Sequence, residues 1–203
     1  MKRLLLILGF SGLFGFVPAQ ESSDYGLFLG ASFDHRQTIL PHPVNVSFMP
    51  AVGAFYRYNL NPRYGIRGGI NFGMIPNTSS MMLDGHGLFE FNFLPLNPTR
   101  DKPKVSTFIA AGLGAFYKSS SNGGNDIGVT IPFDVGVKYR ISENWGLSLE
   151  WDLRRIVWRF GENEFSKFAP SNWYSYVGVT ANYKIIRTCK TCPFYESNRK
   201  KNR

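Results

Sequence analysis

The side chains best suited to chemistry in this chain are three histidines and a few serines and aspartates. His35, His42 and His86 fall in or beside segments that we expect to form loops. Hydrolysis by a Ser–His–Asp triad would need a serine and a carboxylate around one of them. The sequence offers Ser47, Ser79, Ser80 and Asp84 for those roles. Their spacing assembles no triad, and no histidine pair has the spacing, with a carboxylate, that a metal site needs. We therefore expect no catalytic residue, no metal and no cofactor.

The two cysteines, Cys189 and Cys192, form a Cys-x-x-Cys motif. Such a pair can be a redox centre, half of a metal site, or two thiols without chemistry. Redox chemistry usually needs a thioredoxin-like βαβ setting, and a zinc site needs two further ligands, which are not nearby. In an exported chain, an oxidised local loop or a link to a partner is the expected state.

The N-terminus has the three parts of a secretory leader. Residues 1–3 carry two basic side chains, Leu4–Val17 is apolar, and Pro18-Ala19 ends in a small residue. The apolar run is too short for a good transmembrane helix, although an uncleaved N-terminal anchor is an alternative. We predict cleavage after Ala19, and Gln20 in place of a cysteine argues against a lipid anchor. The expected organisation is a signal peptide at 1–19, a barrel at 20–186 and a basic tail at 187–203.

Alternation of apolar and polar residues is the main signal in the rest of the chain. Successive side chains of a strand point to opposite faces, so each alternating segment predicts a strand. The polar faces carry charges in mid-strand, whereas the apolar faces are rich in Phe, Trp and Tyr. A membrane barrel has this arrangement, with apolar side chains toward lipid and polar ones inside. We predict an all-β fold, an eight-stranded antiparallel up-and-down transmembrane β-barrel of the OmpA-like type, in the outer membrane. Its strands would be Tyr25–Phe33, Met49–Asn59, Tyr64–Gly73, Leu88–Phe93, Ser106–Tyr117, Ile131–Arg140, Trp145–Arg154 and Trp173–Ile185.

The connections alternate in length, as periplasmic turns and surface loops do in such barrels. The short ones are Asn59–Arg63 and Ile141–Asn144. The long ones are Asp34–Phe48, Met74–Gly85, Lys118–Val129 and Arg155–Asn172. An even number of strands places both chain ends in the periplasm. Aromatic side chains near the strand ends would form girdles at the two interfaces, namely Tyr25, Tyr58, Tyr64, Tyr139, Trp145, Trp173 and Tyr183.

Charged residues on the polar faces would share the lumen. An eight-stranded barrel has an interior that side chains fill, and unpaired charge away from water is unfavourable. We therefore expect a paired network that closes the barrel, which makes it a plug and not a pore. The expected members are Arg57, Arg67, Glu90, Asp134, Lys138, Arg140, Glu150, Asp152 and Arg154.

Most of the excess positive charge lies outside the strands. The formal net charge is +9, and the tail from Arg187 onward is strongly basic. A third turn, Leu94–Val105, is long, rich in proline and also basic. Because the chain has a secretory leader and its positive charge is localised, nucleic acid is not the expected binding partner. An acidic protein or anionic lipid is expected instead. The expected contact residues are Arg100, Lys102, Lys104, Arg187, Lys190, Arg199, Lys200 and Lys201.

Four segments in order resemble one family. They are Arg57–Leu60, Glu90–Phe93 with Thr107–Tyr117, Pro132–Arg140 with Trp145–Trp151, and Asn172–Val179. Together, over about residues 25 to 195, they are similar to the PorG-like outer-membrane proteins of Bacteroidetes. One departure is clear, because relatives often carry an acidic stretch after strand seven and this chain has the basic, apolar stretch Arg154–Phe160.

The resemblance implies a function in type IX protein secretion. PorG-like proteins are small, non-enzymatic barrels associated with a periplasmic ring of PorK-like and PorN-like proteins, and the family has no catalytic residues to carry over. We therefore expect a barrel that anchors such a ring to the outer membrane. The alternatives are a generic OmpA-like structural or adhesive barrel, a lipid enzyme with its active site at the rim, and a narrow channel.

Overall fold

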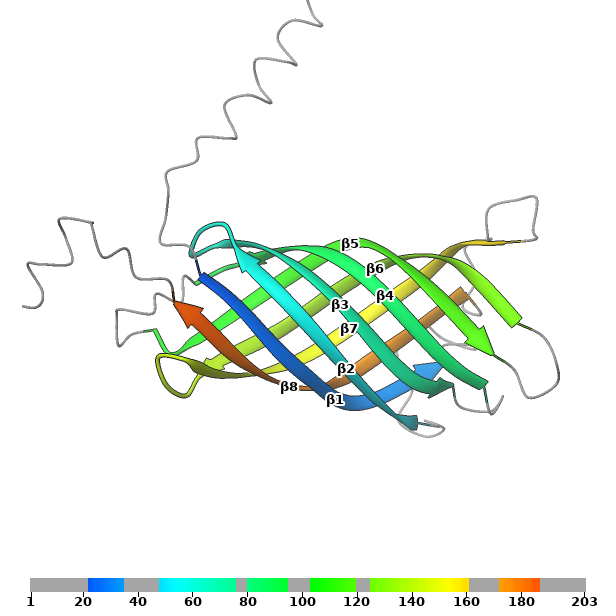
Figure 1. The fold of residues 1–203 in the computed structure, drawn as a ribbon, viewed down its shortest axis with the longest axis horizontal. Helices are drawn as coiled ribbons and strands as arrows, with labels where there is room; N and C mark the ends of the chain where they lie inside the picture. The colour runs from blue at the N-terminus through cyan, green and yellow to red at the C-terminus, as the bar shows by residue number, and fades with distance from the viewer. Residues whose placement is uncertain are drawn as a thin grey trace, which may run out of the picture.

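A computed structural model describes residues 22–34, 48–75, 80–94, 103–119, 125–160 and 172–186. These residues form a closed barrel in which each strand pairs with the next and β1 pairs with β8 (Figure 1). The predicted eight-stranded, antiparallel, OmpA-like barrel is therefore confirmed. The strands are β1 (Ser22–Asp34), β2 (Phe48–Asn59), β3 (Tyr64–Ile75), β4 (Ser80–Asn92), β5 (Val105–Ser119), β6 (Asn125–Arg140), β7 (Trp145–Arg159) and β8 (Trp173–Ile186).

Several predicted features lie outside the described residues. They are the signal peptide and its cleavage site, both cysteines, and the basic tail. In the described part of the chain, no helix is both long enough and apolar enough to span a bilayer.

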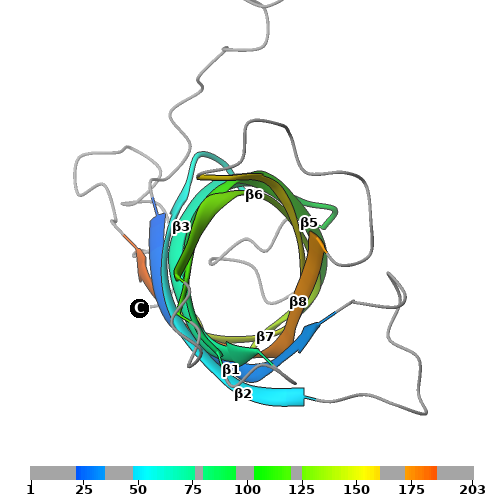
Figure 2. The same ribbon diagram turned by 90° about the vertical axis from the view of Figure 1, so that its right-hand side faces the viewer.

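The ring closes through the pairing of β1 with both β2 and β8. Tyr25 lies opposite Tyr56 on one side and opposite Tyr183 on the other. Viewed along the barrel, the strands form one continuous wall (Figure 2). Each of the eight described strands pairs with a neighbour on both sides, so backbone hydrogen bonding is satisfied around the ring, as a bilayer requires.

The barrel has two different ends. The start of β1, the end of β8 and the tight turns at 60–63 and 141–144 lie together at the left of Figure 1, and we call this the turn end. In the first turn, Asn61 accepts hydrogen bonds at 2.8 Å from the backbone N–H groups of Arg63 and Tyr64. In the second, the hydroxyl of Ser142 accepts one at 3.1 Å from the N–H of Trp145. We call the opposite end the loop end.

The predicted long connection Met74–Gly85 is wrong. β3 continues to Ile75 and β4 begins at Ser80, eight residues before the expected Leu88, so only 76–79 separate them. The inward side chains of early β4 include a carboxylate and an imidazole, those of Asp84 and His86, which are residue types common in loops. Outward Met81 and Leu83 nevertheless keep the alternation that a strand requires.

The connections that follow β5 and β7 at this end are also shorter than predicted. β5 runs to Ser119 and β6 begins at Asn125, while β7 continues to Arg159. A register shift between Val129 and Thr130 interrupts the pairing of β6 with β7 in this extension. Such a bulge increases local twist and helps long strands to follow the curve of the wall.

The outer surface of the barrel is apolar. Leu113 is 67% exposed and Leu149 59% exposed, and both point away from the lumen in mid-strand. At the turn end, Tyr183 packs against Tyr25 at 5.6 Å and Trp145 at 5.2 Å between ring centroids, as expected of an interface girdle. Trp173 does not belong to the predicted girdle, because its side chain is buried.

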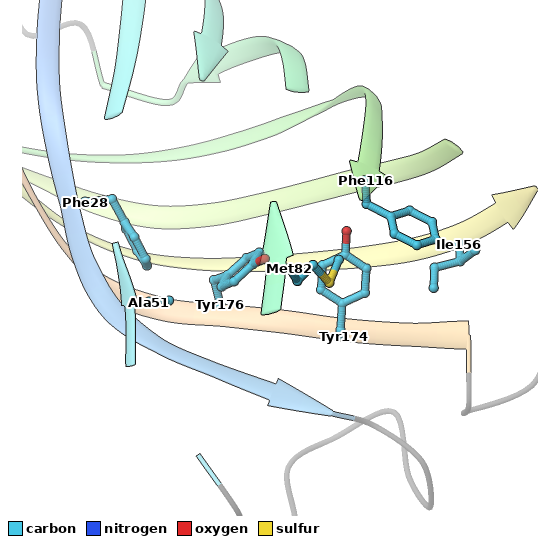
Figure 3. Packing of buried hydrophobic residues seen from close by; sticks show 7 residues of the cluster. All are labelled: Phe28, Ala51, Met82, Phe116, Ile156, Tyr174 and Tyr176. Carbon is cyan, nitrogen blue, oxygen red and sulfur yellow. The ribbon is translucent and has the colours of Figure 1, made fainter. Parts of the chain in front are cut away.

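The apolar part of the interior is small and lies toward the loop end. In Figure 3 the cluster extends from Phe28 and Tyr176 on one side to Phe116 and Ile156 on the other, and Ala51, Met82 and Tyr174 complete it. The rings of Phe28 and Tyr176 meet edge-on, with centroids 6.4 Å apart. Most of the remaining interior is polar.

Glycines make room for the inward aromatic rings. A Cβ at Gly136 would lie 2.4 Å from the backbone oxygen of Leu149 and 2.7 Å from the ring of Phe108. Gly178 opposes the ring of Phe28 in the same way, since a Cβ at this glycine would lie 2.7 Å from that ring. These glycines allow a ring from a neighbouring strand to lie flat against the wall.

Candidate functional site

The candidate site is the charged lumen. Strand alternation directs ionisable side chains inward, and the curvature of the wall buries them. Glu90 is 0% exposed and Arg67 2% exposed, although neither lies in an apolar core. The buried charged residues of the described ranges are Asp24, Arg57, Arg67, Asp84, Glu90, Asp134, Lys138, Glu150, Asp152 and Arg154. They form three groups along the barrel axis.

The group nearest the turn end is centred on Glu90. Nε of Arg57 lies 3.0 Å from one Glu90 oxygen, and the Lys138 ammonium contacts the other. Arg57 also pairs with Asp24 at 3.0 Å, and Lys138 donates to the amide oxygen of Asn92 at 2.7 Å. Two cations thus neutralise two carboxylates. We call these five residues the Glu90 cluster.

The middle of the lumen is organised by Arg67. Its guanidinium pairs with Asp134 and, at 3.0 Å, with Glu150. The second oxygen of Glu150 accepts a hydrogen bond at 3.0 Å from the hydroxyl of Thr180. The guanidinium carbon lies 5.8 Å from the ring centroid of Phe108, within the range of a cation–π contact. One arginine therefore links strands β3, β6 and β7.

The group toward the loop end is centred on Arg154. The guanidinium of Arg154 pairs with Asp84 and, at 2.5 Å, with Asp152. The hydroxyl of Tyr174 donates to Asp84 at 2.5 Å. The guanidinium also lies 3.0 Å from Nδ1 of His86. Because arginine can only donate, Nδ1 of the imidazole is the acceptor.

His86 is not beside a surface loop, as predicted, but inside the barrel on β4. In a Ser–His–Asp triad, Nδ1 carries a proton that it donates to the carboxylate. Here Nδ1 faces the guanidinium of Arg154 at 3.0 Å and is 3.5 Å from Asp84, so its closer neighbour holds the wrong tautomer for a triad. His35, His42, Ser47 and Ser79 lie outside the described residues, and Ser80 is buried at the start of β4.

Metal binding has no site in the part of the chain that the structure describes. Within those ranges, no three His, Cys, Asp or Glu side chains are grouped so that they could hold an ion. The carboxylates of the lumen face arginines and a lysine instead.

Most residues predicted for the lumen lie in these three groups, and Arg140 lies half-buried at the turn end. Sequence reasoning missed Asp24, Asp84, His86 and Tyr174. Asp24 could have been found, because it is in phase with inward Gly26 and Phe28 on β1. Asp84 and His86 were hidden by the error in the start of β4.

The predicted contact residues are mostly outside the described ranges. Lys104 is described, and its exposed side chain lies at the turn end, where its carbonyl accepts a 2.8 Å hydrogen bond from the N–H of Arg140. The others, outside those ranges, are Arg100, Lys102, Arg187, Lys190, Arg199, Lys200 and Lys201.

The lumen is packed at mid-height. Phe108 is 0% exposed, and Arg67 and Asp134 beside it are 2% and 3% exposed. A water-filled channel would leave such inward side chains wet. In the described residues, the middle of the lumen is thus filled by cross-linked side chains.

Comparison with known proteins supports the fold. No protein-family model matches the sequence, and no curated protein matches it either. Among solved structures, the chain is similar to Neisserial surface protein A (NspA), with a TM-score of 0.55 and 11% identity over 83% of this chain and 98% of that one. It is also similar to the N-terminal β-barrel domain of Pseudomonas aeruginosa OprF, with a TM-score of 0.53 and 10% identity over 82% of this chain and 98% of that one. At these identities the likeness is one of fold, and that fold is the small eight-stranded β-barrel of outer-membrane proteins.

Proposed function

We propose that this protein is a non-enzymatic barrel of the outer membrane that anchors a periplasmic assembly, and that its turn end faces the periplasm. The observation that carries the proposal is the ion-paired lumen. Because the buried cations are engaged with carboxylates, the interior is used for holding the barrel together. The contacts with other molecules are then made at the two ends of the barrel.

The turn end has the charge for docking an acidic partner. Arg63 and Lys104 are exposed there, and Arg140 and Lys184 are half-buried, whereas Glu143 is an exposed carboxylate. Among these described residues the cations are in excess. Opposite charge steers association and sets orientation, and its effect weakens with salt.

Two segments that continue from this end add more basic residues by sequence. The segment 95–102 follows β4 and contains Arg100 and Lys102, and the tail at 187–203 follows β8 and is strongly basic. We propose that these residues, with Lys104, form the contact with the partner.

The finer proposal is that the partner is the periplasmic ring of a type IX secretion system. It rests on the resemblance of four ordered segments to the PorG-like proteins. The ring would be built from PorK-like and PorN-like proteins, and the barrel would tie it to the membrane. The generic OmpA-like structural barrel is favoured by the likeness to NspA and OprF, which is a likeness of fold.

Co-purification of the tagged protein with cross-linked envelope proteins tests the proposal. Deleting 187–203 should leave a folded barrel but lower the recovery of periplasmic ring proteins, because the largest block of positive charge is lost. Adding Arg100→Gln, Lys102→Gln and Lys104→Gln should lower it further. A control that replaces exposed apolar Leu113 with Val should recover the partners fully. Unchanged recovery after both charge removals would contradict the anchoring function.

A secretion assay separates the finer proposal from the generic one. Deleting the whole gene should block export of type IX substrates if the barrel belongs to that system. Normal export in the deletion strain, with altered envelope integrity or adhesion, would instead support the generic barrel.

A further inference from the structure

A cavity of about 100 Å³, with charged side chains in its lining, opens at the turn end of the lumen. One water needs about 10–15 Å³ by the same measure, so the space takes a small polar group together with water. The floor of the cavity is formed by members of the Glu90 cluster other than Glu90 itself. Its sides are the first residues of β1 and β7, the last residues of β2, β6 and β8, and the turns at 60–63 and 141–144. Its charged lining consists of Asp24, Arg57, Lys138, Arg140, Glu143 and Lys184.

Positive charge exceeds negative charge in this lining. Four cations stand against two carboxylates. Glu90 lies beneath the cavity and takes up charge from Arg57 and Lys138, and Arg57 also pairs with Asp24. Even with Glu90 counted, the cations remain in excess by one.

Lys184 contributes to this excess. Asp24 lies opposite it in the pairing of β1 with β8, but the two oxygens of Asp24 already accept hydrogen bonds from Arg57 and Asn59. The backbone of Lys184 is held to the turn by two hydrogen bonds: its N–H donates to the carbonyl of Asn144 at 2.7 Å, and its carbonyl accepts from the Asn144 side chain at 2.9 Å. Within the described ranges, its ammonium forms no ion pair with a carboxylate. A half-buried cation on a fixed backbone is screened less than one on the open surface.

We infer that this cavity receives one carboxylate, the side chain of an aspartate or glutamate from the protein that docks on the turn end, and that Lys184 pairs with it. This inference rests on the proposed anchoring function and names the partner's chemistry. The rim of the cavity extends to the outward residues Tyr139, Trp145 and Leu147, so a lipid headgroup is the competing occupant, and lipid-doped micelles distinguish it from a peptide carboxylate. A protruding peptide side chain can enter from the periplasmic side.

The test uses the full-length mature protein in detergent micelles and two tripeptide probes, acetyl-Gly-Asp-Gly-amide and its Asn counterpart. Backbone amide signals of Asn144, Trp145 and Lys184 are followed by NMR. The Asp peptide should shift them saturably and the Asn peptide should not. Lys184→Gln should weaken the binding about tenfold, as for loss of one partly desolvated charge pair. Lys118→Gln, a matched loss of a half-buried lysine at the loop end, should leave it unchanged.

Three results would overturn the inference. They are no saturable shift with the Asp peptide, equal shifts with the Asn peptide, and equal weakening by the two lysine variants. Micelles doped with phosphatidylglycerol that reproduce the shifts without any peptide would also overturn it, in favour of a lipid headgroup. An unchanged amide spectrum away from the cavity shows that each variant is folded.

The two proposals can fail separately. If the Asp peptide does not bind but periplasmic ring proteins still co-purify with the barrel, the carboxylate site is wrong and the anchoring function stands. If the peptide binds but no periplasmic protein co-purifies, the site stands and its assignment to an anchoring partner is wrong.

Discussion

Replacing Arg67 with methionine should strongly destabilise the barrel. Arg67 is buried in mid-lumen, where it pairs with Asp134 and Glu150 and lies beside the rings of Phe55 and Phe108. Methionine has a similar length but no charge, so two carboxylates would remain buried without their cation. Breaking a buried pair in this way costs about 3–5 kcal/mol. The unfolding equilibrium constant should therefore rise by a factor on the order of 10² to 5 × 10³.

Equilibrium unfolding in urea, with the barrel refolded in lipid vesicles and followed by tryptophan fluorescence, measures this change. The triple variant Arg67→Met, Asp134→Asn, Glu150→Gln should regain most of the lost stability, because it removes the stranded charges as well. The main penalty of breaking a buried ion network is the uncompensated charge that remains, and the triple variant leaves none. Arg63→Met, in the exposed turn 60–63, should leave the midpoint of unfolding unchanged.

A loss of less than about 1 kcal/mol for Arg67→Met would refute the reasoning, since that is the range of exposed ion pairs. It would mean that water reaches the middle of the lumen. A triple variant less stable than the single one would also contradict it, because the penalty would then come from lost packing and not from stranded charge.

Three further predictions concern the wall, the outer surface and the lumen. Gly136→Ala should lower stability by about 1–3 kcal/mol, as overpacking does, whereas Gly85→Ala, where a Cβ meets nothing within 4 Å, should be tolerated in the same urea assay. Leu149→Arg, on the outer face in mid-strand, should cost about 2–4 kcal/mol in vesicles, as expected of an arginine in hydrocarbon; no loss would mean that this face is not in the bilayer. Tyr174→Phe should cost about 1.5–3 kcal/mol, because the 2.5 Å hydrogen bond to the carboxylate of Asp84 is lost, and a shift of the urea midpoint measures it.

The alternation of apolar and polar residues was sufficient to predict the barrel. In β3, Ile66, Ile70 and Phe72 alternate with Arg67 and Asn71, and this period places the two sets on opposite faces whatever the strand pairs with. Charges on one face and aromatics on the other then decide which face meets lipid. The prediction failed where the inward residues were unusually polar. The start of β4 was missed because Asp84 and His86 made a buried face look exposed.

The ion pairs themselves depend on the closed tertiary structure. Arg67 meets Asp134 and Glu150 from strands that are 67 and 83 residues away in sequence, and Arg154 meets Asp84 across the lumen. A one-residue change of register would turn any of these side chains to the outer face. The sequence by itself therefore determined that this chain forms an eight-stranded barrel with charged residues inside. Only the register and closure of the ring decided which charges meet, because the distances between strands are set by the wall as a whole and not by any one strand.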